Sequence, residues 1–246
     1  MGDEQQLRLR RHQHLARVPA LAMTEAATAR LACERVDALL PQLPAGTGWL
    51  SVQEQARLGS MERTGRRSQF VAARWLLRQL LVQAHGGRPQ DWPLDAPADA
   101  PPRVQGHAHL HVSLSHSGAW VAAAVAAVPV GIDVEVPRRE RDVEGLVALC
   151  CTPAEQRSFE GLAAAGRHAL FHQLWTAKES WLKRRGEWLA PARLVQLEAT
   201  PHPQGEVRCW RMQEGWLALC VDAGELHCDS PAWQPAGRRR ISDLSS

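Results

Sequence analysis

The segment VGIDVEV, residues 130–136, alternates β-branched residues with a glycine and two carboxylates. Side chains alternate across a β-strand with a period of two, so the valines and the isoleucine share one face. Gly131, Asp133 and Glu135 share the other face, with the two acidic Cα atoms about 7 Å apart. Like charges at this spacing repel one another unless water or a cation lies between them. The segment therefore predicts a strand with one apolar face and one acidic face.

Two interpretations of the acidic face stay open at this point. It fits the solvated side of an edge strand. It also fits part of a magnesium site, because Mg²⁺ binds carboxylate oxygens together with water and substrate phosphate. Gly131 leaves room beside the two carboxylates, but a metal site needs a further ligand from another part of the chain.

Helices are expected on both sides of this strand. Capping boxes, in which a serine or threonine precedes a glutamate by three residues, mark two helix starts. Apolar residues at helical spacing, each run followed by glycine, mark two longer helices. The expected segments are a helix from Ser51, one over 69–83, one from Thr152 and one over 168–186.

Strand-like alternation fills much of the remaining sequence. The expected strands are one from His109 that breaks at 115–118, one over 119–127, its hairpin partner over 130–136, and short strands after 194. Because helices and antiparallel hairpins are mixed without a regular βαβ order, the sequence indicates an α+β fold.

A second charged pattern lies in the segment WTAKESWLK, residues 175–183. On a helix, Trp175, Glu179 and Lys183 form one column at intervals of four residues. Glu179 and Lys183 have the favourable order for a surface ion pair, which is one interpretation. Tryptophans flank the charges, however, so the column is also expected to face protein and to complete a carboxylate and phosphate site.

A third pattern, SLSHSG at residues 113–118, combines hydroxyls, backbone N–H groups and an imidazole at a strand end. Such groups are suitable phosphate donors, and they are equally common in ordinary turns. A nucleophilic serine is a further alternative, but Ser115 and Ser117 lack the G-x-S-x-G elbow of the hydrolases.

Composition and charge exclude several classes. Hydrophobic residues make up 45% and charged residues 22%, as in soluble globular proteins. No apolar run reaches membrane length, and the N-terminal residues lack a secretory signal, so a cytoplasmic protein is expected. The net charge is +3, but 1–20 and 231–246 each carry +2, which leaves −1 for the rest. A nucleic-acid partner is therefore not expected.

Together, GIDVE at 131–135 and WTAKESWLK at 175–183 resemble the 4′-phosphopantetheinyl transferases of the surfactin-synthetase-activating (Sfp) type. That family's pattern is G-[IV]-D-x-E followed by W-x-x-K-E-x-x-x-K, and both parts occur here without a mismatch. The resemblance extends from Trp49 to Thr200. It implies transfer of the phosphopantetheine arm of coenzyme A to a serine of an apo acyl or peptidyl carrier protein, releasing adenosine 3′,5′-bisphosphate.

The resemblance also implies roles for individual residues. Asp133, Glu135 and Glu179 are expected to hold Mg²⁺, with Mn²⁺ as an alternative. Glu179 is further expected to act as general base, and Lys183 to contact the phosphates. The residues expected at coenzyme A are Ser115, His116, Lys178, Lys183, Arg66, Arg67, Arg74 and Arg103.

Two positions depart from the family's pattern. Many relatives carry arginine directly before the aromatic residue of the first long helix, where this chain has Gln69. Arg66 and Arg67 are the expected replacements. Many relatives also carry Gly-Lys-Pro before the Ser-His-Ser turn, whereas this chain has Ala100-Pro101-Pro102, with Arg103 as the nearest cation.

The implied architecture is a monomer of two similar lobes related by a pseudo-twofold axis, with the active site at their interface. The expected boundaries are a flexible basic arm at 1–22, lobes at 23–137 and 138–233, and a flexible tail at 234–246. The expected partners are coenzyme A and acidic carrier proteins, with no membrane partner. Two alternatives remain: a metal-dependent nuclease, and a degenerate homologue that binds coenzyme A or carrier protein without turnover.

Overall fold

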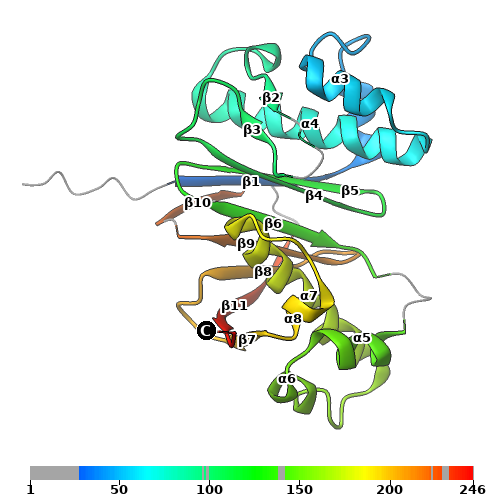
Figure 1. Cartoon of the computed structure of the whole chain (residues 1–246), viewed down its shortest axis with the longest axis vertical. Helices are drawn as coiled ribbons and strands as arrows, with labels where there is room; N and C mark the ends of the chain where they lie inside the picture. The colour runs from blue at the N-terminus through cyan, green and yellow to red at the C-terminus, as the bar shows by residue number, and fades with distance from the viewer. Residues whose placement is uncertain are drawn as a thin grey trace, which may run out of the picture.

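Two β-sheets lie face to face in the structure, and each carries a long helix on its outer side (Figure 1). This computed structural model describes residues 28–95, 97, 100–137, 142–222, 224–228 and 233–245. The predicted flexible arm at 1–22 lies outside the described residues. The resulting order of layers is helix, sheet, sheet, helix, and the α+β prediction is confirmed.

The first sheet has the strand order β10-β1-β5-β4, and only its β10–β1 pairing is parallel. Its strands are β1 (Thr28–Arg35), β4 (His111–Ser117), β5 (Trp120–Ala126) and β10 (Glu225–Cys228). A separate short ribbon pairs β2 (Leu94–Asp95) with β3 (Arg103–Val104).

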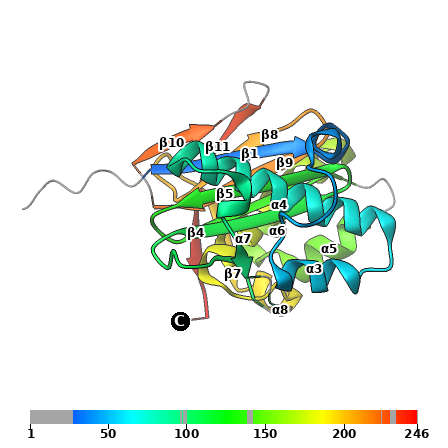
Figure 2. The ribbon, with the colours of Figure 1, turned by 90° about the horizontal axis from the view of Figure 1, so that it is seen from above.

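The second sheet is antiparallel throughout and has the order β6-β9-β8-β11-β7. Its strands are β6 (Val130–Glu135), β7 (Leu197–Pro201), β8 (Val207–Arg211), β9 (Trp216–Val221) and β11 (Gln234–Asp243). Seen from above, the strands of the two sheets are layered over one another, with α4 in front of them and α7 behind them (Figure 2).

The helices on the first sheet are α2 (Val36–Leu39), α3 (Val52–Gly59) and α4 (Thr64–His85). Those on the second sheet are α5 (Val143–Cys150), α6 (Pro153–Arg157), α7 (Ala164–Arg185) and α8 (Pro191–Leu194). Both predicted capping boxes are present, at the starts of α3 and α6. Among the described helices, none is both long and apolar enough to cross a membrane.

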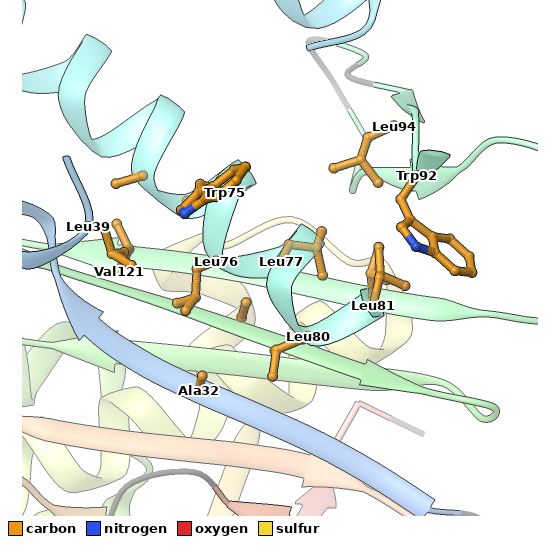
Figure 3. Close-up of a cluster of buried hydrophobic side chains, with 14 of the residues drawn as sticks. Ala32, Leu39, Trp75, Leu76, Leu77, Leu80, Leu81, Trp92, Leu94 and Val121 are labelled. Carbon is orange, nitrogen blue, oxygen red and sulfur yellow. The ribbon is translucent and has the colours of Figure 1, made fainter. Parts of the chain in front are cut away.

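Leucines at helical spacing on α4 form the core that covers the first sheet (Figure 3). Leu76, Leu77 and Leu80 are at most 3% exposed, and Leu76 and Leu80 point toward the strands (Figure 3). Alanines of β5 keep this sheet thin, and Ala122 and Ala124 face the opposite core, between the two sheets. The small side chains therefore let α4 and the second sheet both approach β5 closely.

The predicted hairpin between 119–127 and 130–136 is wrong. β6 pairs along its whole length with β9, from Val130 opposite Val221 to Glu135 opposite Trp216, and so belongs to the second sheet. The change of sheet falls in the loop between Ala126 and Val130, ahead of the predicted lobe boundary at 138. β10, from the C-terminal half of the chain, pairs with β1, so the first sheet also contains one strand from that half.

The predicted flexible tail at 234–246 is also wrong through Asp243. β11 lies between β8 and β7 and pairs with both. Ile241 is 7% exposed in the core under α7, and Arg239 bonds the carbonyl oxygen of Ala199 and the side chain of Gln173. The charged run Arg238-Arg239-Arg240 suggested a solvated tail, but it belongs to a strand in which alternate residues, Arg239 and Ile241, are buried.

Candidate active site

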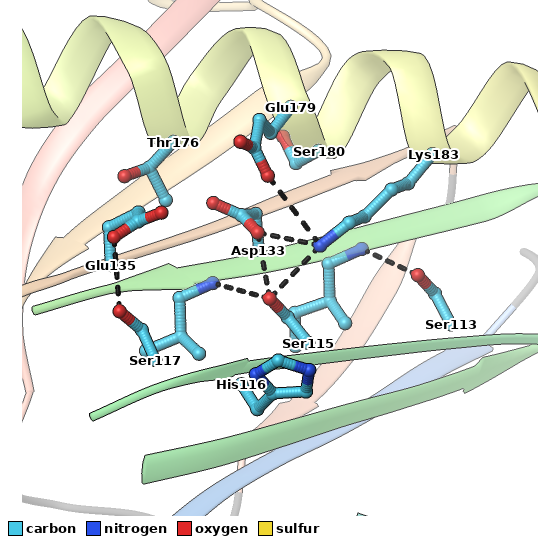
Figure 4. Close-up of polar contacts among 12 residues, drawn as sticks. Ser113, Ser115, His116, Ser117, Asp133, Glu135, Thr176, Glu179, Ser180 and Lys183 are labelled. Atoms are coloured by element: carbon cyan, nitrogen blue, oxygen red, sulfur yellow. Dashed lines mark hydrogen bonds and ion pairs between the residues drawn. The ribbon is translucent and has the colours of Figure 1, made fainter. Parts of the chain in front are cut away.

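Three elements from the two lobes meet at the candidate site: β4 of the first sheet, β6 of the second, and α7 (Figure 4). Gly131 is what lets α7 pack directly on β6. A Cβ atom at this position would lie 2.0 Å from the carbonyl oxygen of Ser180 and 2.4 Å from the backbone nitrogen of Arg184. This close packing brings the column of Glu179 and Lys183 over the acidic face of β6.

The three predicted metal ligands come together. Asp133, Glu135 and Glu179 each offer a carboxylate oxygen, and these oxygens lie within 4.8 Å of one another. Asp133 is 1% exposed, and its Oδ2 atom receives no hydrogen bond from any described residue. Hard divalent cations bind carboxylate oxygens. Because Asp133 Oδ2 is buried without a hydrogen bond from the described residues and lies beside two further carboxylates, these residues fit such an ion.

Glu179 shows how strongly these carboxylates interact. Its side chain is 11% exposed. Burial, followed by the charge of Asp133, raises its pKa to about 9, although Lys183 acts in the opposite direction. Glu179 therefore carries a proton at neutral pH unless a cation compensates the neighbouring charges.

Lys183 bridges the two sides of the site. Its Nζ donates to Asp133 Oδ1 at 2.6 Å and to Ser115 Oγ at 3.0 Å, and lies 3.8 Å from Glu179 Oε2. Burial opposes its charge, but the charges of Asp133 and Glu179 outweigh this and raise the pKa of Lys183. The ammonium group therefore stays charged and, being 31% exposed, can still reach a ligand.

A cavity of about 320 Å³ opens from the carboxylates toward α3 and α4. Its lining combines the four acidic and basic groups above with three arginines, a histidine and an aromatic ring. The lining residues are Arg57, Met61, Arg66, Phe70, Ala73, Arg74, Ala100, Pro102, Leu114, Ser115, His116, Asp133, Glu135, Glu179 and Lys183. Such a cavity suits a phosphorylated ligand.

Arg66 and His116 lie together on the wall of this cavity. A guanidinium nitrogen of Arg66 is 3.1 Å from His116 Nδ1. Burial, and then the charges of Arg66 and Lys183, lower the pKa of His116 to about 4. The imidazole is therefore neutral near pH 7, and a phosphate placed between these groups would offset the repulsion that Arg66 and Lys183 add to the effect of burial.

Arg74 is held more rigidly. Its guanidinium stacks 3.6 Å from the centre of the Phe70 ring and lies 3.6 Å from Glu54. Glu54 is fully buried and also accepts two hydrogen bonds from Arg78. Burial lowers the pKa of Arg74 to about 9 in spite of Glu54. One carboxylate thus serves two arginines, which leaves positive charge available for an anion in the cavity.

Two predicted coenzyme A contacts are contradicted by the structure. Lys178 is 1% exposed and points away from the site, where its ammonium group bonds Glu155 and the carbonyl oxygens of Cys150 and Leu194. Arg67 bonds the carbonyl oxygens of Leu58 and Met61 at the end of α3. Both residues stabilise packing, because neighbouring columns of a helix face different surroundings.

Two other predictions have a mixed outcome. Arg103 does not line the cavity at the carboxylates but lies on an adjoining one, together with Pro101 and Pro102. Gln69, which stands where many relatives have arginine, bonds the carbonyl oxygen of Gly118. Arg66 is therefore the residue of the Arg66–Arg67 pair that reaches the cavity.

Arg57 is a cavity residue that the sequence patterns missed. Its guanidinium donates to the carbonyl oxygen of Pro97 at 2.6 Å and lies 6.0 Å from the centre of the Phe70 ring. The capping box at Ser51 fixed the start of α3, but only the packing of α3 against α4 shows which face of the short helix meets the cavity.

Comparisons with known proteins bear directly on this site. Residues 129–229 match the family model of the 4′-phosphopantetheinyl transferase superfamily. The matched range includes β6 and α7, and with them all three carboxylates and Lys183. The match supports the superfamily that the two sequence motifs predict.

Two curated relatives are similar to the chain. A stretch of 72 residues is 31% identical to the 4′-phosphopantetheinyl transferase HetI of Nostoc sp., covering 29% of this chain and 30% of that protein. A longer stretch of 204 residues is 26% identical to the putative 4′-phosphopantetheinyl transferase slr0495 of Synechocystis sp., covering 78% of this chain and 82% of that protein. Both names lie within the same superfamily.

Proposed function

We propose that this protein transfers the 4′-phosphopantetheine arm of coenzyme A to a serine hydroxyl of an apo acyl or peptidyl carrier protein. The other product is adenosine 3′,5′-bisphosphate, and we assign the protein to the Sfp type of the superfamily. The observation that carries this proposal is the convergence of three carboxylates and Lys183 at the floor of a cavity walled by three arginines and His116. The match of residues 129–229 to the 4′-phosphopantetheinyl transferase superfamily supports the reaction class.

Asp133, Glu135 and Glu179 would hold a divalent cation, which we take to be Mg²⁺, with Mn²⁺ as an alternative. When bound, such an ion supplies charge neutralisation for a pyrophosphate and orients its oxygens. Lys183 adds a fixed positive charge at the same place, since it is already bonded to Asp133. The charge that develops on the leaving phosphate is stabilised by these preorganised groups.

Glu179 is the proposed general base. It comes from α7, whereas Asp133 and Glu135 come from β6, so Glu179 lies across the site from the two strand carboxylates (Figure 4). A carboxylate with a raised pKa accepts a proton readily once it is ionised, which suits removal of the proton from a serine hydroxyl. The serine oxygen then attacks the phosphorus that bears the pantetheine arm, and the bond to the bridging pyrophosphate oxygen breaks.

The cavity walls account for the nucleotide end of coenzyme A. Arg57, Arg66 and Arg74 give it a positive wall on the side of α3 and α4. His116 offers a ring nitrogen beside Arg66, a combination that suits a terminal phosphate such as the 3′-phosphate. Carboxylates alone would also suit a nuclease, but the chain outside 1–20 and 231–246 carries a net charge of −1, which does not favour binding to a nucleic-acid backbone.

A second cavity, of about 500 Å³, continues from Glu179 and Lys183 and supports a place for the carrier protein. Trp188 and Leu189 on its rim are 67% and 44% exposed, which is unusual for large apolar side chains. Arg103 lies on the same cavity. An acidic carrier protein with an apolar contact residue beside its serine would fit this rim.

Release of adenosine 3′,5′-bisphosphate from coenzyme A tests the proposal. Release is expected only when an apo carrier protein and a divalent cation are both present, and it is expected to stop in Lys183→Met. Lys178→Arg is the matched control, because it changes the neighbouring lysine that points away from the site. Coenzyme A that binds without any release, across several carrier proteins, would favour the degenerate homologue.

A further inference from the structure

Three serines of β4 face the edge of β6 (Figure 4). Ser113, Ser115 and Ser117 occur at every second residue, so they share one side of their strand. Each hydroxyl oxygen accepts a hydrogen bond from a backbone N–H of β6 or of the residue that follows it. The donors are Ile132 at 3.0 Å, Val134 at 3.3 Å and Val136 at 3.1 Å. We call these three serines the serine ladder.

The serine ladder pairs a row of N–H groups on the edge of β6 that no strand of the second sheet pairs. β6 is the edge strand of the second sheet, and β4 is the edge strand of the first. Ile132 and Val134 are at most 1% exposed, so their N–H groups have no access to solvent. Unpaired buried N–H groups are costly, and the serine hydroxyls here replace the carbonyl groups of a neighbouring strand.

Two members of the serine ladder also contact metal-site carboxylates. Each hydroxyl has a single proton to donate. Ser115 donates to Asp133 Oδ1 at 2.7 Å, and Ser117 donates to Glu135 Oε2 at 3.0 Å. Ser113 accepts from the N–H of Ile132, next to Gly131, and donates to no carboxylate among the described residues. The ladder therefore contains two members with a carboxylate and one member without.

We propose that Ser117 is a positioning residue for the metal site, acting through Glu135. The N–H of Val136 occupies the acceptor side of its hydroxyl, which directs the proton toward the carboxylate. This holds Glu135 oriented toward Asp133 and Glu179 before a cation arrives. The inference rests on the proposed function in that these carboxylates hold a divalent cation. Ser115 contacts Lys183 and the cavity as well, so Ser117 gives the cleaner test.

Mn²⁺ binding followed by electron paramagnetic resonance tests this role without any turnover. Outer partners of metal ligands typically change metal affinity by about 10- to 100-fold when they are removed. Ser117→Ala is therefore expected to weaken Mn²⁺ binding about tenfold. Ser113→Ala is the matched control. It also removes a hydroxyl that accepts from a backbone N–H of β6, but that hydroxyl contacts no carboxylate in the described part of the chain. Its Mn²⁺ affinity is expected to stay within about twofold of the wild type, well below the change typical of a metal-ligand partner.

A second pair of variants keeps the test sharp if the alanine variant folds poorly. Ser117→Thr and Ser117→Val both favour a strand and have nearly the same shape, but only threonine keeps the hydroxyl. Threonine is expected to preserve Mn²⁺ binding and valine to weaken it. Equal affinity in the two variants, or equal loss in Ser117→Ala and Ser113→Ala, would overturn the role of Ser117 while leaving the proposed function intact. A wild-type protein that binds no Mn²⁺, with or without coenzyme A, would overturn both.

Discussion

Replacing Glu179 by glutamine is expected to stabilise the metal-free protein and to weaken its binding of a divalent cation. In the metal-free protein, burial and the charge of Asp133 raise the pKa of Glu179 to about 9. The folded state therefore holds a proton at this carboxyl over a range in which the unfolded chain, with an ordinary glutamate pKa near 4.3, has lost it. Folding binds one proton there, so the metal-free protein loses stability as pH rises toward 9.

The size of the effect follows from the linkage relation. One extra proton bound in the folded state lowers the free energy of unfolding by about 1.4 kcal/mol per pH unit. Glutamine resembles the protonated carboxyl and does not titrate, so Glu179→Gln lacks this slope. Between pH 6 and pH 8, the variant is expected to gain about 2 to 3 kcal/mol relative to the wild type. The same variant is expected to lose Mn²⁺ affinity, because one carboxylate ligand is gone.

Urea unfolding at several pH values, with chelator present, measures the first effect. Mn²⁺ titration measures the second, and the wild type should bind Mn²⁺ more tightly as pH rises, by up to tenfold per unit below pH 9, because the ion displaces a proton. Parallel wild-type and variant stability curves between pH 6 and pH 8 would refute the assignment of a buried, proton-holding Glu179. Unchanged Mn²⁺ affinity in the variant would refute its role as ligand.

Three further predictions follow from packing. Lys178→Met should lower the free energy of unfolding by about 3 to 5 kcal/mol by leaving Glu155 buried and unpaired, with the KM for coenzyme A unchanged; a raised KM at unchanged stability would restore the predicted phosphate role. Gly131→Ala should cost at least about 1 to 3 kcal/mol and weaken Mn²⁺ binding, because α7 is pushed from β6; a fully stable and active variant contradicts the close packing. Trp188→Ala should raise the KM for the carrier protein and leave the KM for coenzyme A unchanged. The free energy of unfolding in urea should stay within about 0.5 kcal/mol of the wild type. If variant and wild type have the same KM for the carrier protein, the carrier docks elsewhere.

The sequence predicted the faces of β6 correctly, because strand alternation is a local property. It did not predict the partner of β6. The sequence pattern predicts pairing of β6 with β5, its neighbour in sequence, whereas the true partner, β9, begins at Trp216. Pairing over such a distance depends on how the helices pack, and alternation contains no information about it.

In the candidate site, too, the local features were predictable from the sequence and the long-range contacts were not. Helical spacing placed Glu179 and Lys183 on one face of α7, and the structure brings both to Asp133. Spacing alone did not show that Lys178, one residue away, lies in a core with Glu155. In the sequence, Glu155 is recognisable only as the glutamate of the capping box that starts at Thr152. Nothing in that local pattern shows that it also pairs with Lys178.

The arginines show that the sequence does not predict which of several nearby side chains reaches a cavity. Arg57, Arg66 and Arg67 lie close together in the sequence, but only Arg57 and Arg66 line the cavity. Arg67 is turned toward backbone carbonyls at the end of α3. The family resemblance therefore predicted coenzyme A contacts for Arg66 and Arg67, whereas the direction of each side chain depends on the packing of α3 against α4.

The central claim is tested most directly by the intact mass of an apo carrier protein after incubation with coenzyme A, Mg²⁺ and this protein. The proposed function predicts the addition of one phosphopantetheine group, and its loss with chelator, in Asp133→Ala, and in a carrier protein whose acceptor serine is alanine. An unchanged mass across fatty-acid, polyketide and peptide-synthetase carrier proteins, with a wild type that binds both Mn²⁺ and coenzyme A, would contradict it.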